Sequence, residues 1–587
     1  MPDATEPPAQ FAISLLGHET GELLAAGDQC LAGGAAGDAE ALFHTAAIKR
    51  PWDPETRYKL ASAQIAGGKL DEALRTLAEA REHHARLMLE AHAPDALRVD
   101  ADFQRLLSLA DTFYASHQVA TASSLYQRLI DSHPEIPALR VGLGFSLQHQ
   151  GRMDEAIGVF EALERRWSNP QHHSLLHYAL AFERPSAAAM YQEGLRYAAR
   201  HAAHLPKDRR RLSRVDGKLR IGYFCQLFNE HQVTKFLVPV LEHHDRDRFS
   251  LVCYSGTPAS DETGRAIRDS VDLWRDVAGV NDETFALRVA MDEIDIFVDL
   301  WGHTVGNRLT VFARKPAPIA VSWLNYIETT GLAEIDYVLH ADGYDLPGAQ
   351  ALYAETIYPI GPVIAPFRPF YETPPAGETP MLTNDFMSFG CFGHPAKLTL
   401  AVIRTWSRVL LAVPTAKLIL RSVYFKDPTL QFTLSTKFAA FGVVGERIEF
   451  PAFESGAAFL DAYRAIDLIL DPFPYQGLTT SLDAVSSGVP VLTWEGQYMH
   501  DRVTAVTLRA CGLDDLVAMT EDAYVETAVA LANDPTRLNR LRARVRPGFE
   551  ASPYRDEAGF TRRLEAAFEA MAVAHAAPKA IAAPASG

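Results

Sequence analysis

The sequence predicts an α-solenoid followed by two α/β lobes, each built on a parallel sheet. Small and bulky residues recur with a 34-residue period in the first third of the chain. From Leu219 onward, short apolar runs rich in β-branched and aromatic residues alternate with helical stretches. The loop ETPPAGETP (372–380) interrupts this alternation, so the second part divides into two lobes.

The composition is that of a globular protein with several cores. The chain has 587 residues, of which 48% are hydrophobic and 22% charged. A net charge of −17 argues against a general nucleic-acid binder and against docking on anionic membranes. The five cysteines form no CxxC pair, which indicates neither a zinc site of the usual spacing nor a disulfide framework. Without a signal-peptide pattern or a long apolar run, we expect a cytoplasmic protein.

The repeat is defined by residues at three recurring positions. Two pairs of alanines are spaced by 34 residues: Ala39 with Ala73, and Ala122 with Ala156. Twelve residues before each lies another small residue: Gly27, Ala61, Ala110 and Gly144. Four residues after each lies a large apolar one: Phe43, Leu77, Tyr126 and Phe160. Five residues before three of the alanines lies a glycine: Gly34, Gly68 and Gly151.

This pattern resembles the tetratricopeptide repeat. Small residues let two antiparallel helices approach, the glycine forms the turn between them, and the bulky residue fills the space to the next unit. The predicted units are 20–53, 54–87, 103–136 and 137–170. Such arrays have a concave face that usually binds a peptide or protein. The alternative is an irregular helical bundle.

Four strands are predicted in the first lobe, which we place at 218–380. They are LRIGYFC (219–225), FSLVCYS (249–255), IDIFVDLWG (294–302) and IAVSWLNY (319–326). Helices are expected at 263–271 and 282–292. A helical linker at 171–217 joins this lobe to the repeats at 20–170. Its basic end, KDRRRLSRVDGKLR (207–220), is a solvated connector or, alternatively, a phosphate-binding segment.

Five strands are predicted in the second lobe, which we place at 381–555. They lie within 387–393, 417–423, 447–452, 467–473 and 490–494. A last helix at 556–573 is expected to cross back over the first lobe. We expect the termini at 1–19 and 574–587 to be disordered.

The motif DPFPYQGLTTSLDAVSSGVPVLT (471–493) is the most specific candidate site. A buried strand ends at Asp471, and Thr479 and Thr480 open a helix after a Pro/Gly turn. Two hydroxyls beside free backbone N–H groups are suited to a pyrophosphate, and Asp483 to a ribose. The alternative is that Thr479 caps the helix and Asp483, in its first turn, complements the helix dipole.

Three further loops carry candidate residues. In GCFGHPAKLT (390–399), Lys397 and His394 are suited to contacting a diphosphate, unless Lys397 is a surface residue. After the first strand, His231 is suited to act as general base or as donor to a ligand oxygen, although a lone His is more often structural. In DLWGHTVGNRL (299–309), His303 and Asn307 are candidates for contact with sugar or acceptor. No DxD pair lies in a strand-end loop, so we predict no metal.

Together these segments resemble the O-GlcNAc-transferase family of protein glycosyltransferases over nearly the whole chain. The resemblance rests on LRIGYF with His231, RKPAPIAVSWLNYIETTG (314–331), CFGHPAK with Lys397, and DPFPYQGLTTSLDA. It implies tetratricopeptide repeats followed by a GT-B fold of two Rossmann-like lobes. The first lobe would serve the acceptor and the second would bind the nucleotide-sugar.

The resemblance also implies roles for individual residues. Lys397, Thr479 and Thr480 would hold the donor diphosphate, and Asp483 the ribose. His231 would lie at the donor–acceptor junction. The transfer would invert the anomeric carbon and require neither a metal nor a cofactor beyond the nucleotide-sugar. A hydroxyl would attack as the nucleotide leaves, so Lys397 and the helix N-terminus would stabilise the charge on the leaving phosphate.

One more position matches the family pattern and others depart from it. Arg502, in YMHDRVTA, matches a donor-binding position. Leu478, by contrast, replaces a His that precedes the threonine pair in the animal enzymes. Phe459 stands where those enzymes have a uracil-stacking His, and Gly456 where they have a Lys. Phe459 retains the ability to stack on a pyrimidine, but the base pocket differs, and so the donor is expected to differ as well.

The sequence leaves three hypotheses for function. The first is a protein O-glycosyltransferase whose repeats recruit the acceptor. In its most specific form, this enzyme modifies flagellin with a CMP-nonulosonic acid. Such a donor carries one phosphate instead of two, so its site needs fewer positive charges. The second is a UDP-GlcNAc- or UDP-hexose-dependent protein O- or N-glycosyltransferase. The third is a non-enzymatic repeat adaptor or chaperone.

Overall fold

A computed structural model describes most of the chain. The described residues are 20–50, 54–69, 103–183, 186–208, 210–214, 217–326, 328–374 and 377–576, with Glu72, Ala73, Arg75, Thr76 and Glu79. They divide into two compact units. The first comprises the residues up to Val159 together with Met381–Glu454 and Ala528–Asn533. The second comprises Phe160–Pro380, Ser455–Thr527 and the residues from Asp534 onward. The termini predicted to be disordered lie outside the described residues, apart from 574–576.

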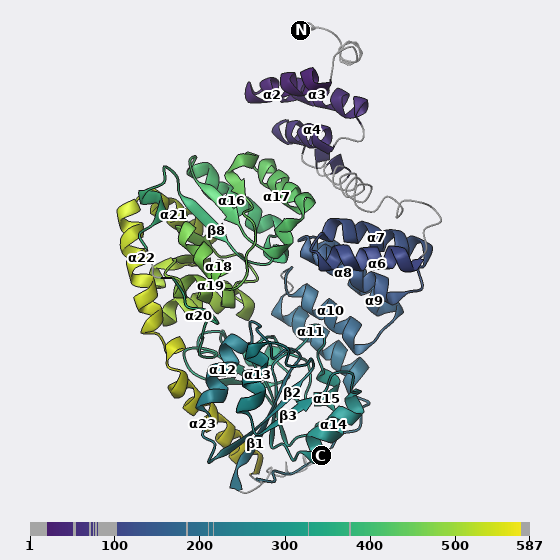
Figure 1. Cartoon of the computed structure of the whole chain (residues 1–587), viewed down its shortest axis with the longest axis vertical. Coiled ribbons are helices and arrows are strands. Elements are labelled where there is room, and N and C mark those ends of the chain that lie inside the picture. Colours follow the sequence, from purple (N-terminus) through teal and green to yellow (C-terminus); the bar gives the residue numbers. More distant parts are fainter. Residues whose placement is uncertain are drawn as a thin grey trace, which may run out of the picture. The chain divides into compact units, whose positions relative to one another are not determined.

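Antiparallel helix pairs form the predicted repeats of the first unit (Figure 1). The helices are α2 (Thr20–Ala32), α3 (Ala36–Lys49), α4 (Pro54–Ala66), α6 (Phe103–Ala115), α7 (Val119–Ser132), α8 (Pro137–His149) and the start of α9 (Met153–Arg166). The small and bulky repeat positions are buried, with the exception of Leu77, which lies outside the described residues. Among these helices, α2 packs against α3, α3 against α4, α6 against α7, and α7 against α8.

Close helix approach explains the small residues of the repeat. A Cβ atom added to Gly27 would lie 2.4 Å from the Phe43 ring, so only glycine fits there. The turn glycines Gly34, Gly68 and Gly151 all have positive φ, as a tight helix–helix turn requires. The corresponding turn of the third repeat has the same geometry without a glycine, because His117 adopts a φ of 64° there.

Three parallel strands belong to the same unit. They are β8 (Ser388–Cys391), β9 (Lys417–Leu420) and β10 (Ile448–Glu449), in the order β10-β9-β8. They are accompanied by α16 (Leu400–Ala412) and α17 (Pro428–Ala440). The repeats contact the loops that follow these strands: the backbone N–H of Ala120 donates to the buried Asp427 carboxylate at 2.8 Å.

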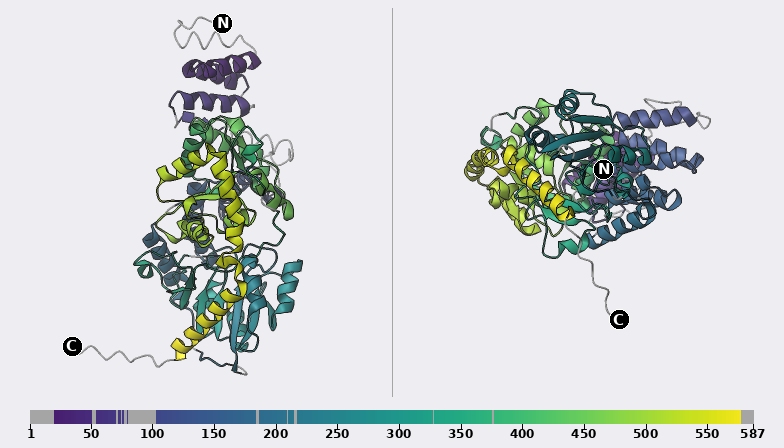
Figure 2. Two further views of the ribbon diagram at one scale, coloured as in Figure 1. Left: turned by 90° about the vertical axis from the view of Figure 1, so that its left-hand side faces the viewer. Right: turned by 90° about the horizontal axis from the view of Figure 1, so that it is seen from below.

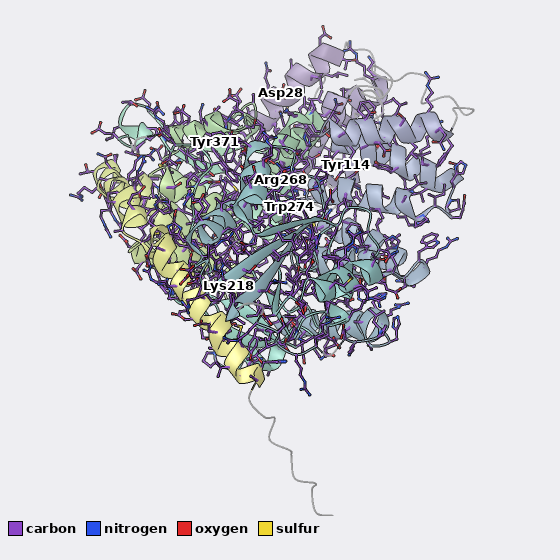
Figure 3. All side chains as sticks on the ribbon, turned by 60° about the horizontal axis from the view of Figure 1, so that its bottom comes forward. Asp28, Tyr114, Lys218, Arg268, Trp274 and Tyr371 are labelled. Carbon is purple, nitrogen blue, oxygen red and sulfur yellow. The ribbon has the colours of Figure 1, made fainter. Side chains whose placement is uncertain are left out.

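A seven-stranded parallel sheet is the centre of the second unit. Its strands are β1 (Leu219–Cys225), β2 (Phe249–Ser255), β3 (Leu273–Asp276), β4 (Ile296–Asp299), β5 (Ile319–Ser322), β6 (Tyr337–His340) and β7 (Thr356–Pro359). They pair in the order β3-β2-β1-β4-β5-β6-β7, which is the order of a doubly wound sheet. Lys218 directly precedes β1, and Trp274 lies on the edge strand β3 (Figure 3).

Helices cover this sheet and close its core. They include α12 (Thr234–His243), α13 (Glu262–Ser270), α14 (Asp282–Met291) and α15 (Leu309–Ala313). A cluster of buried phenylalanines fills the space beneath them: Phe224, Phe285, Phe297 and Phe312. The last helix, α23 (Glu557–Ala576), packs against α12, and its Glu565 accepts a hydrogen bond from the backbone of Asp245 at 2.7 Å (Figure 2). It continues three residues beyond the predicted end.

The second unit also contains the connector and a second set of strands. The connector helices are α10 (Pro170–Leu180), α11 (Ala187–Tyr197) and a π-helical turn, η2 (Ala198–Ala202). Strands β11 (Leu468–Leu470), β12 (Val491–Trp494) and β13 (Val517–Ala518) pair in parallel. Helices α18 (Ala457–Asp461), α19 (Leu478–Ser486), α20 (Val503–Ala510) and α22 (Pro535–Glu550) accompany them.

The predicted strands are present, and four short ones were missed. β1 and β2 have the predicted ends, and the other predicted runs each contain a shorter strand. The missed strands are β3, β6, β7 and β13, which have two to four residues each. Strands this short give almost no periodicity in the sequence. Among the described residues, every helix is too short or too polar to cross a lipid bilayer.

Candidate functional site

The order of the seven-stranded sheet reverses between β1 and β4. Ligands of doubly wound sheets bind beyond the carboxyl ends of the strands at such a point. The loop after β1 carries His231, and the loop after β4 carries Trp301. Their rings lie 5.2 Å apart between centroids, so the structure brings the two loops together at this edge.

His231 is held in a neutral form. Burial lowers the pKa of its imidazole to about 4. Its Nδ1 accepts a hydrogen bond from the backbone N–H of Val233 at 3.3 Å, and its own backbone N–H donates to Thr234 Oγ1 at 3.1 Å. An Nδ1 that accepts carries no proton, so the ring proton is on Nε2.

His303 and Asn307 are buried and bonded within the protein. His303 has no exposed surface and contacts Ser174 Oγ at 2.9 Å and the Thr330 carbonyl at 3.0 Å. Asn307 is 1% exposed, and its amide donates to the carbonyl of Thr304. In this structure both side chains hold the loop after β4, and their contact with sugar or acceptor stays a prediction.

Asp299 closes the same loop from the end of β4. Its buried carboxylate accepts from the backbone N–H groups of Trp301 at 3.1 Å and Gly302 at 3.0 Å. Burial raises the pKa of Asp299 to about 7, although those two bonds oppose the shift. This carboxyl therefore titrates in the physiological range.

The turn before α19 is fixed by a buried carboxylate. Asp471, at the end of β11, accepts from the backbone N–H of Gly477 at 3.0 Å and from Thr493 Oγ1 at 2.7 Å. Gln476 adds a second link, because its side chain accepts from the backbone N–H of Thr504 at 2.8 Å. The backbone at the start of α19 is thereby held in place before any ligand arrives.

The first turn of α19 is open, unlike the rest of this helix. Leu478, Thr479 and Thr480 are half-buried, whereas 481–486 are buried. The N-cap residue is Gly477, which has no side chain to cap the helix, so Thr479 does not serve as the cap. The first-turn N–H groups and the positive end of the helix dipole are suited to an anion.

Asp483 lies in the second turn of α19 rather than the first, and so does not complement the helix dipole. Its buried carboxylate accepts from Lys235 Nζ at 2.8 and 2.9 Å. Burial raises the pKa of Asp483, and Lys235 acts in the opposite direction. The sequence did not indicate Lys235, because 248 positions separate it from Asp483 and no local pattern relates the two residues.

An aromatic pair connects α18 with the first turn of α19. Phe459 is half-buried and lies edge-on to Tyr463, with ring centroids 5.7 Å apart. The Tyr463 hydroxyl donates to the carbonyl of Thr480 at 3.1 Å. Phe459 is therefore anchored near the two threonines. Gly456, which precedes α18, has a φ of 68°, a conformation that strongly favours glycine.

Arg502 is bonded throughout its guanidinium group. Nε donates to the carbonyl of Gly343, Nη1 to that of Gly496, and Nη2 to Glu495 at 2.7 Å. Glu495 also binds Arg509. In this structure Arg502 holds the segment before α20.

The first unit contains the other two donor-site candidates, His394 and Lys397. Both lie in the loop after β8, with Lys397 half-buried at the end of a short 3-10 turn. His394 caps that turn: its Nδ1 accepts from the backbone N–H of Ala396 at 3.1 Å, which leaves the proton on Nε2. Burial, His149 and Lys397 all lower the pKa of His394, so this ring is neutral.

Aromatic residues of the repeats and of the loop after β9 lie beside this loop. The ring of His149, at the end of α8, lies 5.1 Å from His394 and stacks at 4.3 Å on Tyr424. His117, from the unusual repeat turn, lies edge-on to Tyr424 at 5.3 Å. None of these three was a sequence candidate. They were missed because their contacts join the repeats to loops almost 300 residues away.

Comparison with known proteins identifies related families for both parts of the chain. The family model described as Glycosyl transferase family 41 matches residues 151–354 and 378–564, which is more than half of the chain. The model described as Tetratricopeptide repeat matches residues 31–93, as the repeat pattern predicted.

Related proteins are plant, animal and bacterial. A tomato (Solanum lycopersicum) protein named probable UDP-N-acetylglucosamine–peptide N-acetylglucosaminyltransferase SPINDLY is 34% identical over 60% of this chain. A Caenorhabditis elegans protein named UDP-N-acetylglucosamine–peptide N-acetylglucosaminyltransferase is 23% identical over 64%. The matches span only 38% and 43% of those two relatives.

A solved structure matches nearly the whole fold. It is a mutant of the Thermobaculum terrenum O-GlcNAc transferase, 29% identical, with a TM-score of 0.73. The match covers 97% of this chain and 99% of that one. The fold class predicted from the sequence, repeats followed by two Rossmann-like lobes, is thereby confirmed.

Proposed function

Because the chain belongs to glycosyltransferase family 41, we propose that it transfers a sugar from a nucleotide-sugar to a Ser or Thr hydroxyl of a protein. The observation that carries this proposal is the first turn of α19. It is half-exposed, lacks a side-chain cap, and is held in place by the buried Asp471. A turn prepared in this way is suited to the phosphate of a nucleotide-sugar.

The leaving phosphate is the group that the enzyme must stabilise. As the hydroxyl oxygen bonds to the anomeric carbon, the bond from that carbon to the phosphate oxygen breaks, the phosphate leaves with the electron pair, and the hydroxyl proton is released to water. Negative charge therefore develops on the phosphate oxygen. Donors in place before the reaction stabilise that charge more than they stabilise the ground state. We assign this role to the Thr479–Thr480 turn and, by resemblance, to Lys397 and His394. We expect inversion and no metal at the transfer site.

Hydrogen bonding favours a donor role for His231 over a general-base role. A base must offer a lone pair, but the available Nε2 carries the proton while Nδ1 accepts from the backbone. The depressed pKa keeps the ring neutral, so it donates without adding charge. We propose that Nε2–H donates to a ligand oxygen.

Three further residues are proposed to support donor binding. Phe459 stacks on the base, and Asp483 accepts a ribose hydroxyl in addition to its bond with Lys235. Arg502 orders the segment before α20 through its contacts with backbone carbonyls. His303 and Asn307 shape the loop after β4, and any effect on sugar or acceptor would pass through that loop.

The relatives favour a UDP-linked donor, since those described above are named as UDP-N-acetylglucosamine enzymes. The alternative is a CMP-nonulosonic acid transferred to flagellin. Its support is Gly456, where the backbone excludes the Lys of the animal enzymes, so one cation near the nucleotide is missing. A donor with one phosphate requires less positive charge. We propose that the repeats recruit the acceptor in either case.

A transfer assay tests the proposal. The purified chain would be incubated with flagellin or a cell extract and with either UDP-GlcNAc or a CMP-nonulosonic acid, and the products analysed by mass spectrometry. We expect one donor to label Ser or Thr, and Lys397→Ala to reduce labelling at least a hundredfold. Labelled Asn would instead indicate an N-glycosyltransferase.

A matched control separates a site effect from a general loss. Thr263 also lies half-buried in the first turn of a helix, α13, so Thr263→Val should leave labelling unchanged. If neither donor labels any protein, or if Lys397→Ala labels as well as the wild type, the transferase proposal is wrong.

A further inference from the structure

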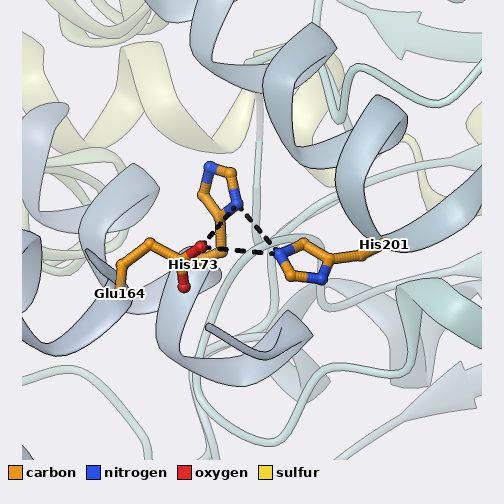
Figure 4. Close-up of side chains that lie close together, drawn as sticks. All are labelled: Glu164, His173 and His201. Carbon is orange, nitrogen blue, oxygen red and sulfur yellow. Dashed lines mark hydrogen bonds and ion pairs between the residues drawn. The ribbon is translucent and has the colours of Figure 1, made fainter. Parts of the chain in front are cut away.

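Three buried side chains converge where the end of α9 meets the connector helices. They are Glu164 on α9, His173 on α10 and His201 in the π-helical turn η2 (Figure 4). Each is less than 8% exposed. The π-turn matters for this arrangement, because a π-turn redirects side chains relative to a regular α-helix, and such turns are frequent at functional sites.

The spacing of the three atoms is that of metal ligands. His173 Nδ1 lies 3.1 Å from His201 Nε2, and Glu164 Oε1 lies 3.5 Å from the first and 3.7 Å from the second. Ligands bound to a tetrahedral ion at about 2.0–2.1 Å lie about 3.3 Å from one another. The average separation here is close to that value.

A second carboxylate orients one of the histidines. His173 Nε2 lies 2.7 Å from Glu193 Oε1, a contact in which the imidazole donates. With its proton on Nε2, the ring directs the lone pair of Nδ1 toward the other two ligand atoms. A carboxylate behind a histidine ligand is the usual support of a protein zinc site.

The cluster also offers one further buried polar atom. Glu164 Oε2 is buried and makes no hydrogen bond, so it is available as an additional ligand atom.

A pocket beside the cluster would admit the ion and a water molecule. It has a volume of about 600 Å³, and Glu164, His173 and Glu193 form part of its lining. Arg200 lies at its edge and contacts Glu164 Oε1 at 3.2 Å. More than half of the Arg200 side chain is exposed, so water screens this contact and the side chain can turn away.

We propose that Glu164, His173 and His201 bind a divalent transition metal of the zinc class, with Glu193 as the positioning carboxylate. Two imidazoles and one carboxylate are a ligand set that suits zinc, and water from the pocket supplies the fourth position. None of these four residues is among those assigned above to sugar transfer. The site therefore adds a metal to a chain whose sequence predicted none, without entering the transfer chemistry.

A metal here would order the loops of the first lobe through α10. His177 lies one helical turn beyond His173. Its ring stacks on that of His303, with centroids 4.2 Å apart, and its Nδ1 shares a hydrogen bond with the Tyr326 hydroxyl at 2.7 Å. These partners belong to the loops after β4 and β5. By linking α9, α10 and η2, the ion would stabilise the connector on which those loops rest.

Metal binding to the untagged full-length chain tests the inference. After treatment with a chelator, the protein would be titrated with Zn²⁺ by calorimetry and with Co²⁺ by absorption spectroscopy. We expect one ion per chain, the strong visible band of tetrahedral Co²⁺, and a rise in Tm on adding Zn²⁺. Glu193→Gln should weaken zinc binding about 10–100-fold, as loss of an outer carboxylate usually does.

The variants of the ligands and a control complete the test. Glu164→Gln preserves the shape of the side chain and should abolish the Co²⁺ band, while His204→Ala, a change at an exposed His nearby, should leave it unchanged. The inference is overturned if the chain binds no zinc. It is also overturned if zinc binds equally to Glu164→Gln and wild type, because the cluster would then be a hydrogen-bonded network only.

Discussion

The loop after β4 and the first turn of α19 both follow a buried strand and carry polar candidates, the second in the more specific motif, and the structure separates them. In the loop after β4, Asp299, His303 and Asn307 are buried and bonded to protein groups. In the turn of α19, Thr479 and Thr480 are half-exposed, and the N-cap provides no side chain. The polar groups of the loop after β4 are bonded within the protein. The first turn of α19 is held in place by Asp471, but no side chain caps its N–H groups.

This difference indicates how to separate support from binding. Polar residues at the end of a buried strand must satisfy their hydrogen bonds, and the protein itself can do so. A binding segment differs because its backbone is fixed by residues such as Asp471, while the residues of its first turn stay partly exposed. The predictions below use this contrast: changes to supporting residues should affect stability, and changes to the open turn should affect affinity.

The largest expected effect concerns the ion pair between Lys235 and Asp483, which lies in the second turn of α19. Lys235→Met leaves the buried carboxylate of Asp483 unpaired, and we expect the free energy of unfolding to fall by about 3–5 kcal/mol at pH 7. The loss should shrink as pH falls, because the Asp483 carboxyl, whose pKa burial already raises, then takes a proton. Urea unfolding measures this, and adding Asp483→Leu should restore most of the stability.

A smaller loss is expected in the loop after β4. His303→Ala removes bonds to Ser174 and Thr330, so the free energy of unfolding should fall by about 2–3 kcal/mol. Nucleotide affinity, measured by calorimetry, should stay within twofold of wild type. A tenfold drop in affinity with an unchanged fold would show that this loop is part of the binding site.

The same loop should give stability a pH dependence. Burial raises the pKa of Asp299 to about 7 in the folded protein, against about 3.9 when unfolded, so the native state holds the extra proton between these values. The contribution to stability is therefore present below about pH 4 and is lost as pH rises through 7. Urea midpoints from pH 4 to 8 should fall less steeply for Asp299→Asn. Identical slopes for both proteins would contradict the assignment.

The smallest effect concerns the base. Phe459→Leu should weaken nucleotide binding about threefold to tenfold by removing the aromatic face, with little loss of stability. Phe386→Leu, a change at another half-buried phenylalanine, is the matched control. If both variants bind nucleotide like the wild type, Phe459 does not stack on the base.

The sequence predicted the architecture well because each element carries local information. The ends of β1 and β2 follow from runs of apolar residues, and the repeat follows from alanines and glycines at fixed spacing. At His117, however, the same left-handed turn forms without glycine, and only the repeat spacing predicted a turn at this position. The candidate Thr479–Thr480 turn could also be located from the sequence, because a strand end and a helix start are local features.

What the sequence could not supply is pairing across long separations. The bond between Lys235 and Asp483 joins residues that no local pattern relates. The cluster of Glu164, His173 and His201 comes from three helices, so it has no motif spacing to recognise. The burial of His303 likewise depends on α10, which lies more than 120 residues earlier in the chain.

Calorimetric titration of the purified chain with UDP, CMP and GDP, in parallel with Thr480→Val and Thr263→Val, tests the central claim most directly. We predict that either UDP or CMP binds with one site per chain, that Thr480→Val weakens binding about tenfold, and that Thr263→Val binds like the wild type. A preference for UDP would favour an N-acetylhexosamine or hexose donor, and one for CMP a nonulosonic acid. If no nucleotide binds, or if Thr480→Val binds as tightly as the wild type, the open turn of α19 is not a nucleotide-sugar site, and the adaptor hypothesis would gain support.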